Sequence, residues 1–222
     1  KSENNEICAL NLKAPKTLVS EKKVNLYYYP SLNSPYTFVS TKRIREIRDE
    51  YPINLFMKPV LPMLMRKMNI PTNKAKYILS DAAREGRRYG NEMKIIHSPI
   101  GNPARKSYSL FPAIDKAGKG FEYIEALLKA SFQDGINIGD DNFLENLVTN
   151  LELDWELIKK DLNSKHWQKI LKDNVEDMYS GNCWGVPSFK ITDEDGSNSF
   201  FTWGQDRIWL LKEEIYKRLE KS

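Results

Sequence analysis

The sequence has 222 residues, enough for one large domain or two small ones. Hydrophobic residues make up 41% and charged residues 29%, which is typical of a globular protein rather than a disordered one. The net charge of +4 is too small, without a long basic run, to indicate nucleic-acid binding. No apolar stretch approaches the roughly 20 residues that cross a bilayer. These totals exclude a membrane span and favour a small acidic ligand over nucleic acid.

The sequence contains two cysteines, Cys8 and Cys183. They form no Cys-x-x-Cys pair, and together with His97 and His166 they give no metal-ligand spacing. We interpret both as free thiols, which suits a reducing compartment, and we expect a cytoplasmic protein without a metal site. The chain begins at Lys1 rather than at Met, which suggests a piece of a longer product.

Residues 1–22 are rich in Lys, Asn and Glu without periodicity, and we interpret them as a lead-in or linker. An apolar, aromatic run over 24–29 then predicts a strand, which Pro30 ends. From Pro35 to Glu50 the sequence predicts a helix with Ser34 as its N-cap, because Pro is favoured in the first turn. The predicted buried side of this helix is Phe38, Val39, Ile44 and Ile47.

Ser34 is a candidate site residue because of where it stands. Free N–H groups and the positive end of the helix dipole meet where a strand leads into a helix, and anions bind there readily. A role as the helix cap alone would explain Ser34 equally simply.

After the first helix, the predicted secondary structure changes from strand to a long run of helices and then back to strands. The alternation over 53–57 predicts a second strand and, with the first helix, a right-handed parallel βαβ unit. A long helical stretch follows, and strand character returns at 186–191 and 200–203 around a hairpin turn, before a last helix over 205–220. The predicted helices between are 61–68, 74–89, 106–117, 120–133, 141–150 and 154–180.

This order, βαβ, helices, then ββα, is the layout of an α/β thioredoxin-like fold with a large all-helical insertion domain. The predicted division is a lead-in over 1–22, a thioredoxin-like domain over 23–70 and 181–222, and a helical insertion over 71–180.

Three motifs carry a family resemblance by their order and spacing: Ser34-Pro35-Tyr36, Gly185-Val186-Pro187 and Gly204-Gln205-Asp206-Arg207. With the helical insertion, the chain resembles the kappa-class glutathione transferases and the 2-hydroxychromene-2-carboxylate isomerases of the DsbA-like superfamily. The resemblance runs from about Val24 to the end. The segment from Tyr108 to Asn137 is similar to the helical domain of the bacterial isomerase-like members. In such folds Pro187 would be a cis-proline that faces the start of the first helix.

The resemblance implies a glutathione-dependent enzyme. Ser34 and Thr37 stand where dithiol oxidases carry Cys-x-x-Cys, so disulfide exchange at these positions is excluded. Glutathione would be the cofactor, with Ser34 as the catalytic residue that donates a hydrogen bond to its thiolate. The reaction would be isomerisation by reversible addition, or conjugation to an electrophilic, aromatic small molecule, and the sequence does not separate the two. A non-catalytic binding module, or a DsbA-like protein that lost its dithiol activity, is the alternative.

The same resemblance implies the remaining contacts with glutathione. Val186 would pair its backbone with the peptide, Asp206 would meet the γ-glutamyl ammonium, and Lys74 would meet the glycyl carboxylate. The implied glutathione-binding set is Ser34, Asn69, Lys74, Val186, Pro187, Gln205 and Asp206. Asn69 and Lys74 are explained nearly as well as a turn residue and a surface lysine. Tyr36 is predicted to line the substrate pocket, and the expected assembly is a homodimer without nucleic-acid or membrane partners.

Overall fold

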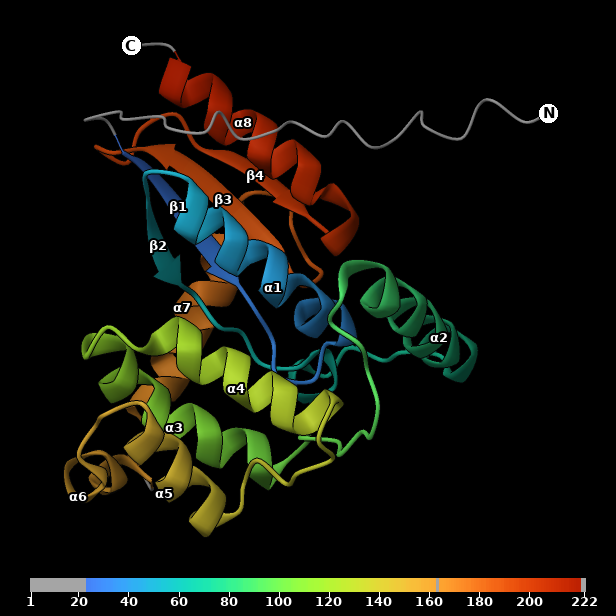
Figure 1. The fold of residues 1–222 in the computed structure, drawn as a ribbon, viewed down its shortest axis with the longest axis vertical. Coiled ribbons are helices and arrows are strands. Elements are labelled where there is room, and N and C mark those ends of the chain that lie inside the picture. Colours follow the sequence, from blue (N-terminus) through green and yellow to red (C-terminus); the bar gives the residue numbers. More distant parts are fainter. Residues whose placement is uncertain (1–22, 163, 221–222) are drawn as a thin grey trace.

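A four-stranded sheet forms the centre of the protein, as a computed structural model shows for residues 23–162 and 164–220 (Figure 1). The strand order is β2-β1-β3-β4. The bounds of the strands are β1 Val24–Tyr29, β2 Ile53–Met57, β3 Ser188–Asp193 and β4 Phe200–Trp203. β1 pairs in parallel with β2 and antiparallel with β3, and β3 pairs antiparallel with β4. The predicted thioredoxin-like fold, a βαβ unit joined to a ββα unit, is confirmed.

The two faces of the sheet are covered by different helices. α1 (Pro35–Glu50) and α8 (Ile208–Glu220) pack on the face that carries Leu26 and Tyr28, both fully buried. α7 (His166–Ser180) lies against the opposite face, where Tyr29 packs near Met178. Because successive strand residues point to opposite faces, β1 contributes to both hydrophobic clusters.

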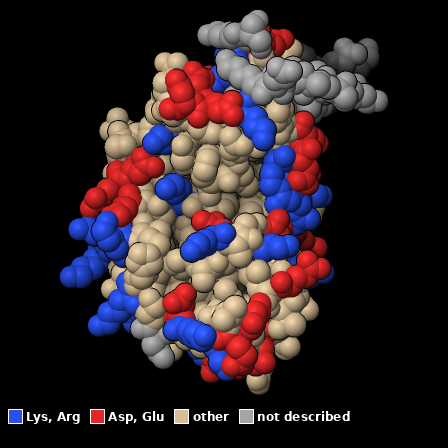
Figure 2. All heavy atoms as spheres, turned by 90° about the vertical axis from the view of Figure 1, so that its left-hand side faces the viewer, with Lys and Arg blue, Asp and Glu red and all other residues tan. Residues whose placement is uncertain are grey.

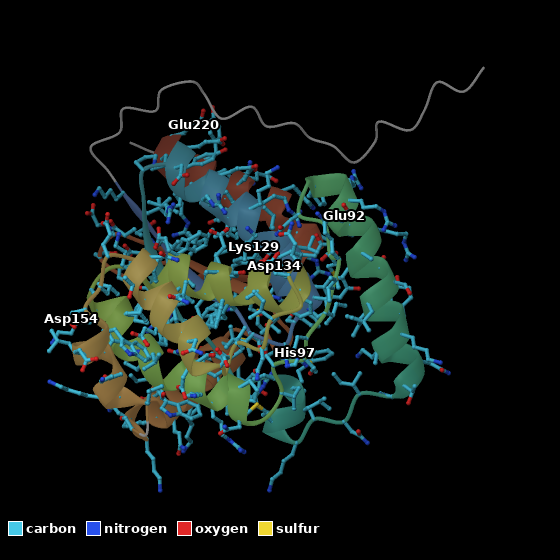
Figure 3. The ribbon with its side chains drawn as sticks, turned by 60° about the horizontal axis from the view of Figure 1, so that its bottom comes forward. Glu92, His97, Lys129, Asp134, Asp154 and Glu220 are labelled. Atoms are coloured by element: carbon cyan, nitrogen blue, oxygen red, sulfur yellow. The ribbon has the colours of Figure 1, made fainter. Side chains whose placement is uncertain are left out.

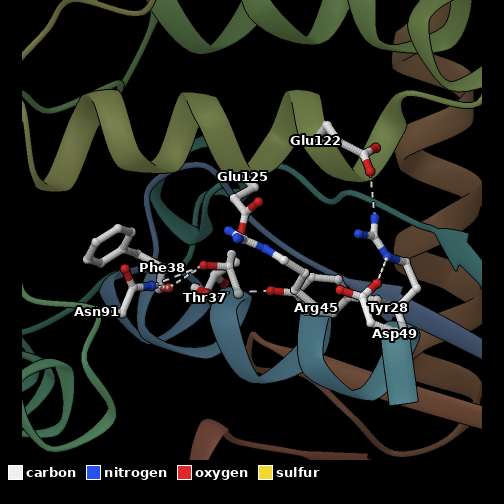
Figure 4. Close-up of polar contacts among 10 residues, drawn as sticks. Tyr28, Thr37, Phe38, Arg45, Asp49, Asn91, Glu122 and Glu125 are labelled. Atoms are coloured by element: carbon white, nitrogen blue, oxygen red, sulfur yellow. Dashed lines mark hydrogen bonds and ion pairs between the residues drawn. The ribbon is translucent and has the colours of Figure 1, made fainter. Parts of the chain in front are cut away.

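The helical insertion lies between β2 and β3 in the sequence. Its helices are α2 (Thr72–Tyr89), α3 (Asn102–Lys116), α4 (Gly120–Phe132), α5 (Asp141–Asn150), the short α6 (Trp155–Ile158) and α7. α4 lies alongside α1, and two ion pairs join the helices: Arg45 with Glu125, and Arg48 with Glu122, whose Nη1 and Oε1 atoms are 2.6 Å apart (Figure 4).

α2 (Thr72–Tyr89) packs on α1 at the side of the molecule (Figure 1). The connection from α2 to α3 then runs beside the end of α4: Lys94 N–H donates to Phe132 O over 3.0 Å and His97 N–H to Ser131 O over 2.8 Å. Figure 3 shows His97 on this connection and Lys129 and Asp134 at the end of α4. The insertion is therefore tied to the sheet domain through α1 on one side and α7 on the other.

Several predicted boundaries are wrong. The stretch 154–180 is broken, because α6 passes into a 3-10 turn at Lys159–Asp161 and α7 begins only at His166. The last helix begins at Ile208, after the 3-10 turn Gln205–Arg207. β3 begins at Ser188 rather than at residue 186, and of 61–68 only Met63–Arg66 forms a 3-10 turn.

Cys183 is a buried free thiol, and burial raises its pKa. Cys8 and the predicted lead-in lie outside the described residues. Among the helices that the structure describes, none combines the length and the apolar character needed to cross a bilayer. The predicted domain boundaries stay a prediction.

Candidate functional site

Ser34 caps α1, as predicted. Its backbone is extended, with φ −112°, and its Oγ accepts the N–H of Thr37 over 3.1 Å. Pro35 in the first turn has no N–H to offer. Because the Thr37 N–H is bonded to Ser34 Oγ, the Tyr36 N–H is the one among residues 35–37 that is left to face a ligand.

The Ser34 side chain faces the segment that contains Pro187. Ser34 Oγ donates to Val186 O over 3.4 Å, and the Val186–Pro187 peptide bond is cis. The Pro187 carbonyl in turn accepts Gly204 N–H over 2.9 Å, which ties this segment to the start of the 3-10 turn. The fold thus joins the first-helix motif, the Gly-Val-Pro motif and the Gly-x-Asp-Arg motif, although they are far apart in the sequence.

Tyr36 is held toward α2. Its hydroxyl donates to Asp81 Oδ2 over 2.8 Å, and Arg84 Nη2 donates to the other carboxylate oxygen over 3.0 Å. Burial and the hydrogen bond to Asp81 raise the pKa of Tyr36 above its usual range, so the phenol stays protonated. The half-buried ring therefore stands in the first turn beside Ser34, with its hydroxyl engaged elsewhere.

Gln205 links two helices rather than facing open solvent. Arg43 Nη2 donates to its Oε1, and its Nε2 donates to Glu85 Oε2 over 3.1 Å. Gln205 is buried, and burial also lowers the pKa of Arg43, whose guanidinium lies over the Tyr89 ring at 3.7 Å. The side chain of Gln205 therefore bridges α1 and α2, which leaves its backbone as the main surface for a ligand.

The charged residues predicted to hold glutathione are exposed. Asp206 turns its carboxylate back over Gly204, whose φ of +103° and missing Cβ make room for it. Lys74 Nζ lies 5.8 Å from the centre of the Trp184 ring, which places it beside the segment that leads into Val186. Asn69 lies exposed in the turn before α2, and no contact among the described residues joins it to Ser34.

Sequence reasoning missed the residues that hold this site in shape. Asp81 and Glu85 lie on α2, and their contacts with Tyr36 and Gln205 span 45 and 120 residues. Trp203 was predicted as a strand residue at the start of the closing motif, but its contact with Trp184, with ring centroids 4.5 Å apart, was not predicted. The Asp81–Arg84 spacing does signal a helical ion pair, but nothing local in the sequence points to Tyr36.

Comparisons with known proteins agree with this geometry. The family model of the DSBA-like thioredoxin domain matches residues 25–216, so the chain belongs to the DSBA-like thioredoxin domain family. A structure of 2-hydroxychromene-2-carboxylate isomerase aligns with a TM-score of 0.72 and 16% identity, over 89% of this chain and 97% of that one.

Two further structures concern the cytosolic disulfide reductase DsbM from Pseudomonas aeruginosa. The first has a TM-score of 0.67 and 14% identity, over 88% of this chain and 99% of that one. The second, DsbM with GSH, has a TM-score of 0.59 and 12% identity, over 76% of this chain and 88% of that one. The search of curated proteins found no match. These likenesses establish the fold, and the solved relatives are isomerase and oxidoreductase enzymes.

Proposed function

We propose that this protein is a glutathione-dependent enzyme that uses a thiolate held near Ser34. The observation that carries the proposal is the contact of the Ser34 hydroxyl with both the first turn of α1 and Val186 O. With Ser34 and Thr37 in place of two cysteines, this chain has no dithiol of its own there, so the thiol must come from a ligand.

The residues present fit glutathione. Within the described part of the chain no hydrogen bond uses the N–H of Val186, so it is open to an extended peptide. Asp206 and Lys74 are exposed, and in this proposal they contact the ammonium group and the glycyl carboxylate of glutathione. When bound, glutathione supplies a thiolate that adds to an electrophilic carbon.

Ser34 acts as a hydrogen-bond donor in this proposal. Its Oγ accepts Thr37 N–H and keeps that bond, while its own proton turns from Val186 O toward the ligand. A donor that is itself accepting a hydrogen bond is polarised and becomes stronger. Each unit by which a thiol pKa falls corresponds to about 1.4 kcal/mol of preference for the thiolate. Tyr36 contributes an aromatic wall for the electrophile, since its phenol stays protonated and bonded to Asp81.

Thermal unfolding with and without glutathione tests the binding step. At 100 times the dissociation constant, a ligand adds about 2.7 kcal/mol to the free energy of unfolding. For a chain of this size that corresponds to a midpoint shift of roughly 5–10 °C. No shift at millimolar glutathione would favour the non-catalytic module instead. S-methylglutathione serves as the control ligand, because it keeps the peptide contacts and lacks the thiol.

Three substitutions at Ser34 separate capping from activation. Ser34→Asp keeps a cap that accepts Thr37 N–H but cannot donate, and we expect the pKa of the bound thiol to rise by at least about one unit. Ser34→Ala raises it as well and costs about 1 kcal/mol of stability as a lost cap. Ser34→Thr retains the hydroxyl and restores the low pKa. The thiolate absorbance of the complex across pH reports these values, with the exposed Ser80→Ala as the matched control. An unchanged titration in Ser34→Asp removes Ser34 from this role.

A further inference from the structure

β2 lies at the outer edge of the sheet, far from Ser34 along the surface. In the parallel ladder Val24 N–H donates to Pro52 O over 3.3 Å and Lys58 N–H donates to Tyr28 O over 2.8 Å. Even-numbered residues of β2 therefore bond to β1, and the N–H and C=O groups of Leu55 and Met57 point away from it, toward the open edge. Figure 2 looks onto this side of the molecule.

A hollow of about 320 Å³ runs along this edge. Leu55, Met57 and Lys58 line it on the strand side, and Asp115 and Phe121 line it from the end of α3 and the start of α4. Phe56, 41% exposed, stacks on Tyr27 with ring centroids 4.9 Å apart and adds an apolar surface beside the hollow. Uncharged surface framed by Lys, Arg, Asp and Glu side chains is visible on this face in Figure 2.

The charged side chains that line the hollow differ in whether they form ion pairs. Arg48 bonds to Glu122 over 2.6 Å and to Asp49 over 2.9 Å, so this group is satisfied. The Asp115 side chain sits over Gly120 and is exposed; among the described residues it forms no ion pair within 4.0 Å, and Lys58 is the charge that acts on it. The surrounding protein atoms raise the pKa of Asp115 to about 6, and Lys58 opposes this only in part. The exposed carboxylate is open to a basic side chain of a ligand.

We propose that this groove, defined by Leu55–Lys58 and Asp115–Glu122, binds an extended peptide that adds to β2 as a further strand and places a Lys or Arg side chain on Asp115. The outward N–H and C=O groups of Leu55 and Met57 supply the ladder hydrogen bonds, as in other strand additions. Alternate side chains of the peptide meet Phe121 on one side and Phe56 on the other. The Asp115 carboxylate selects the basic residue.

The occupant is a peptide rather than a second copy of the chain. The turn between α3 and α4 lines the same hollow as the strand edge, and the proposed strand would lie between them. Pairing two β2 edges around a twofold axis would bring two such turns together. The groove shares no residue with the Ser34 site and does not depend on the glutathione proposal.

Amide hydrogen exchange followed by NMR tests the strand addition on the wild-type protein. The probe is a capped peptide of alternating Val and Thr with a central Arg. At saturation we expect exchange of the Leu55 and Met57 amides to slow at least tenfold, while Phe56, already bonded to β1, does not change. Equal exchange at Leu55 and Met57 with and without peptide overturns the proposal. Protection that grows with protein concentration in the absence of peptide assigns the edge to a second copy and also overturns it.

Substitutions test the basic residue and the edge separately. Asp115→Asn should weaken the Arg peptide about fivefold or more and leave a peptide with Gln in the central position unaffected. Asp173→Asn, on the exposed side of α7, is the matched control. Leu55→Pro removes an outward N–H at an edge position that tolerates Pro, and should abolish binding. If this variant does not fold, the exchange pattern of the wild type still decides. Equal affinity of Asp115→Asn and wild type for the Arg peptide overturns the role of Asp115.

Discussion

α1 and α2 form two walls beside Tyr36, and they are anchored very differently. Eight of the 16 residues of α1 are buried, against two of the 18 in α2. On α2, Tyr77 is 61% exposed and Leu79 41%. Because burial supplies most of a helix's stability in a protein, we expect α1, which follows Ser34, to be more rigid than α2, which carries Lys74. Under the proposed function, a site built this way would hold the reacting sulfur and leave freedom for the two ends of glutathione.

The largest contrast between the walls should appear in core truncations. Phe38→Ala on α1 removes a ring that is 1% exposed and stacks on Phe132, and we expect a loss of about 3–5 kcal/mol in the free energy of unfolding. Leu79→Ala on α2 should change it by less than about 0.5 kcal/mol. Urea unfolding of both variants measures the difference, and similar losses would show that α2 is as firmly anchored as α1.

Gln205 connects the two walls through its hydrogen bonds to Arg43 on α1 and Glu85 on α2. Gln205→Ala leaves the partly buried Arg43 without this acceptor and removes the bond to Glu85, so we expect a loss of about 2 kcal/mol. Hydrogen exchange should also speed up along α2 while the buried amides of α1 remain protected. Gln205→Glu restores the acceptor for Arg43 but repels Glu85, and we expect it to recover only part of the stability. Full stability in Gln205→Ala would mean that the walls are independent.

Substitution of Lys74 should have the smallest effect on the free energy of unfolding and a selective effect on glutathione binding. Lys74→Gln removes an exposed ammonium, so the free energy of unfolding should stay within about 0.5 kcal/mol. We expect affinity for glutathione to fall a few-fold at low salt and the difference to shrink as salt rises. Calorimetry at two salt concentrations measures this, with the exposed Lys76→Gln as the control. An equal loss in both variants would remove Lys74 as a specific contact.

The sequence predicts best those elements whose signals are local. The first strand, the helix from Pro35 to Glu50 and its Ser34 cap are all found as expected, because hydrophobic pattern, capping residue and proline agree there. The break near Leu162 was not predicted, since its carbonyl accepts Ser109 Oγ over 3.1 Å, a contact across 53 residues. β3 starts later than predicted because Pro187 cannot donate to a ladder.

The residues of the candidate site also divide into those with a local sequence signal and those placed by long-range packing. Ser34, Val186 and Pro187 were predicted from motifs, and the structure brings them together. The bond of Tyr36 to Asp81 and the bridging role of Gln205 depend on how α2 packs on α1, which no periodicity encodes. The residues of the groove along β2 carry no motif at all, because an open edge exists only once the strand order is known.

The Asp115 carboxyl gives the protein a preference for mild acidity. Its folded-state pKa of about 6 lies above the ordinary value of 3.8, so the native protein holds this proton more tightly than the unfolded chain. Stability is therefore lost as pH climbs from 3.8 through 6. In Asp115→Asn we expect a gain of about 1 kcal/mol at pH 7.5, reduced by solvent screening, that fades as the solution is acidified toward pH 4. Urea titrations at both pH values would reveal it, and a gain that is equal at the two would exclude this origin. Asp115 is exposed, and a basic side chain bound beside it would favour its charged form and offset this loss of stability at neutral pH.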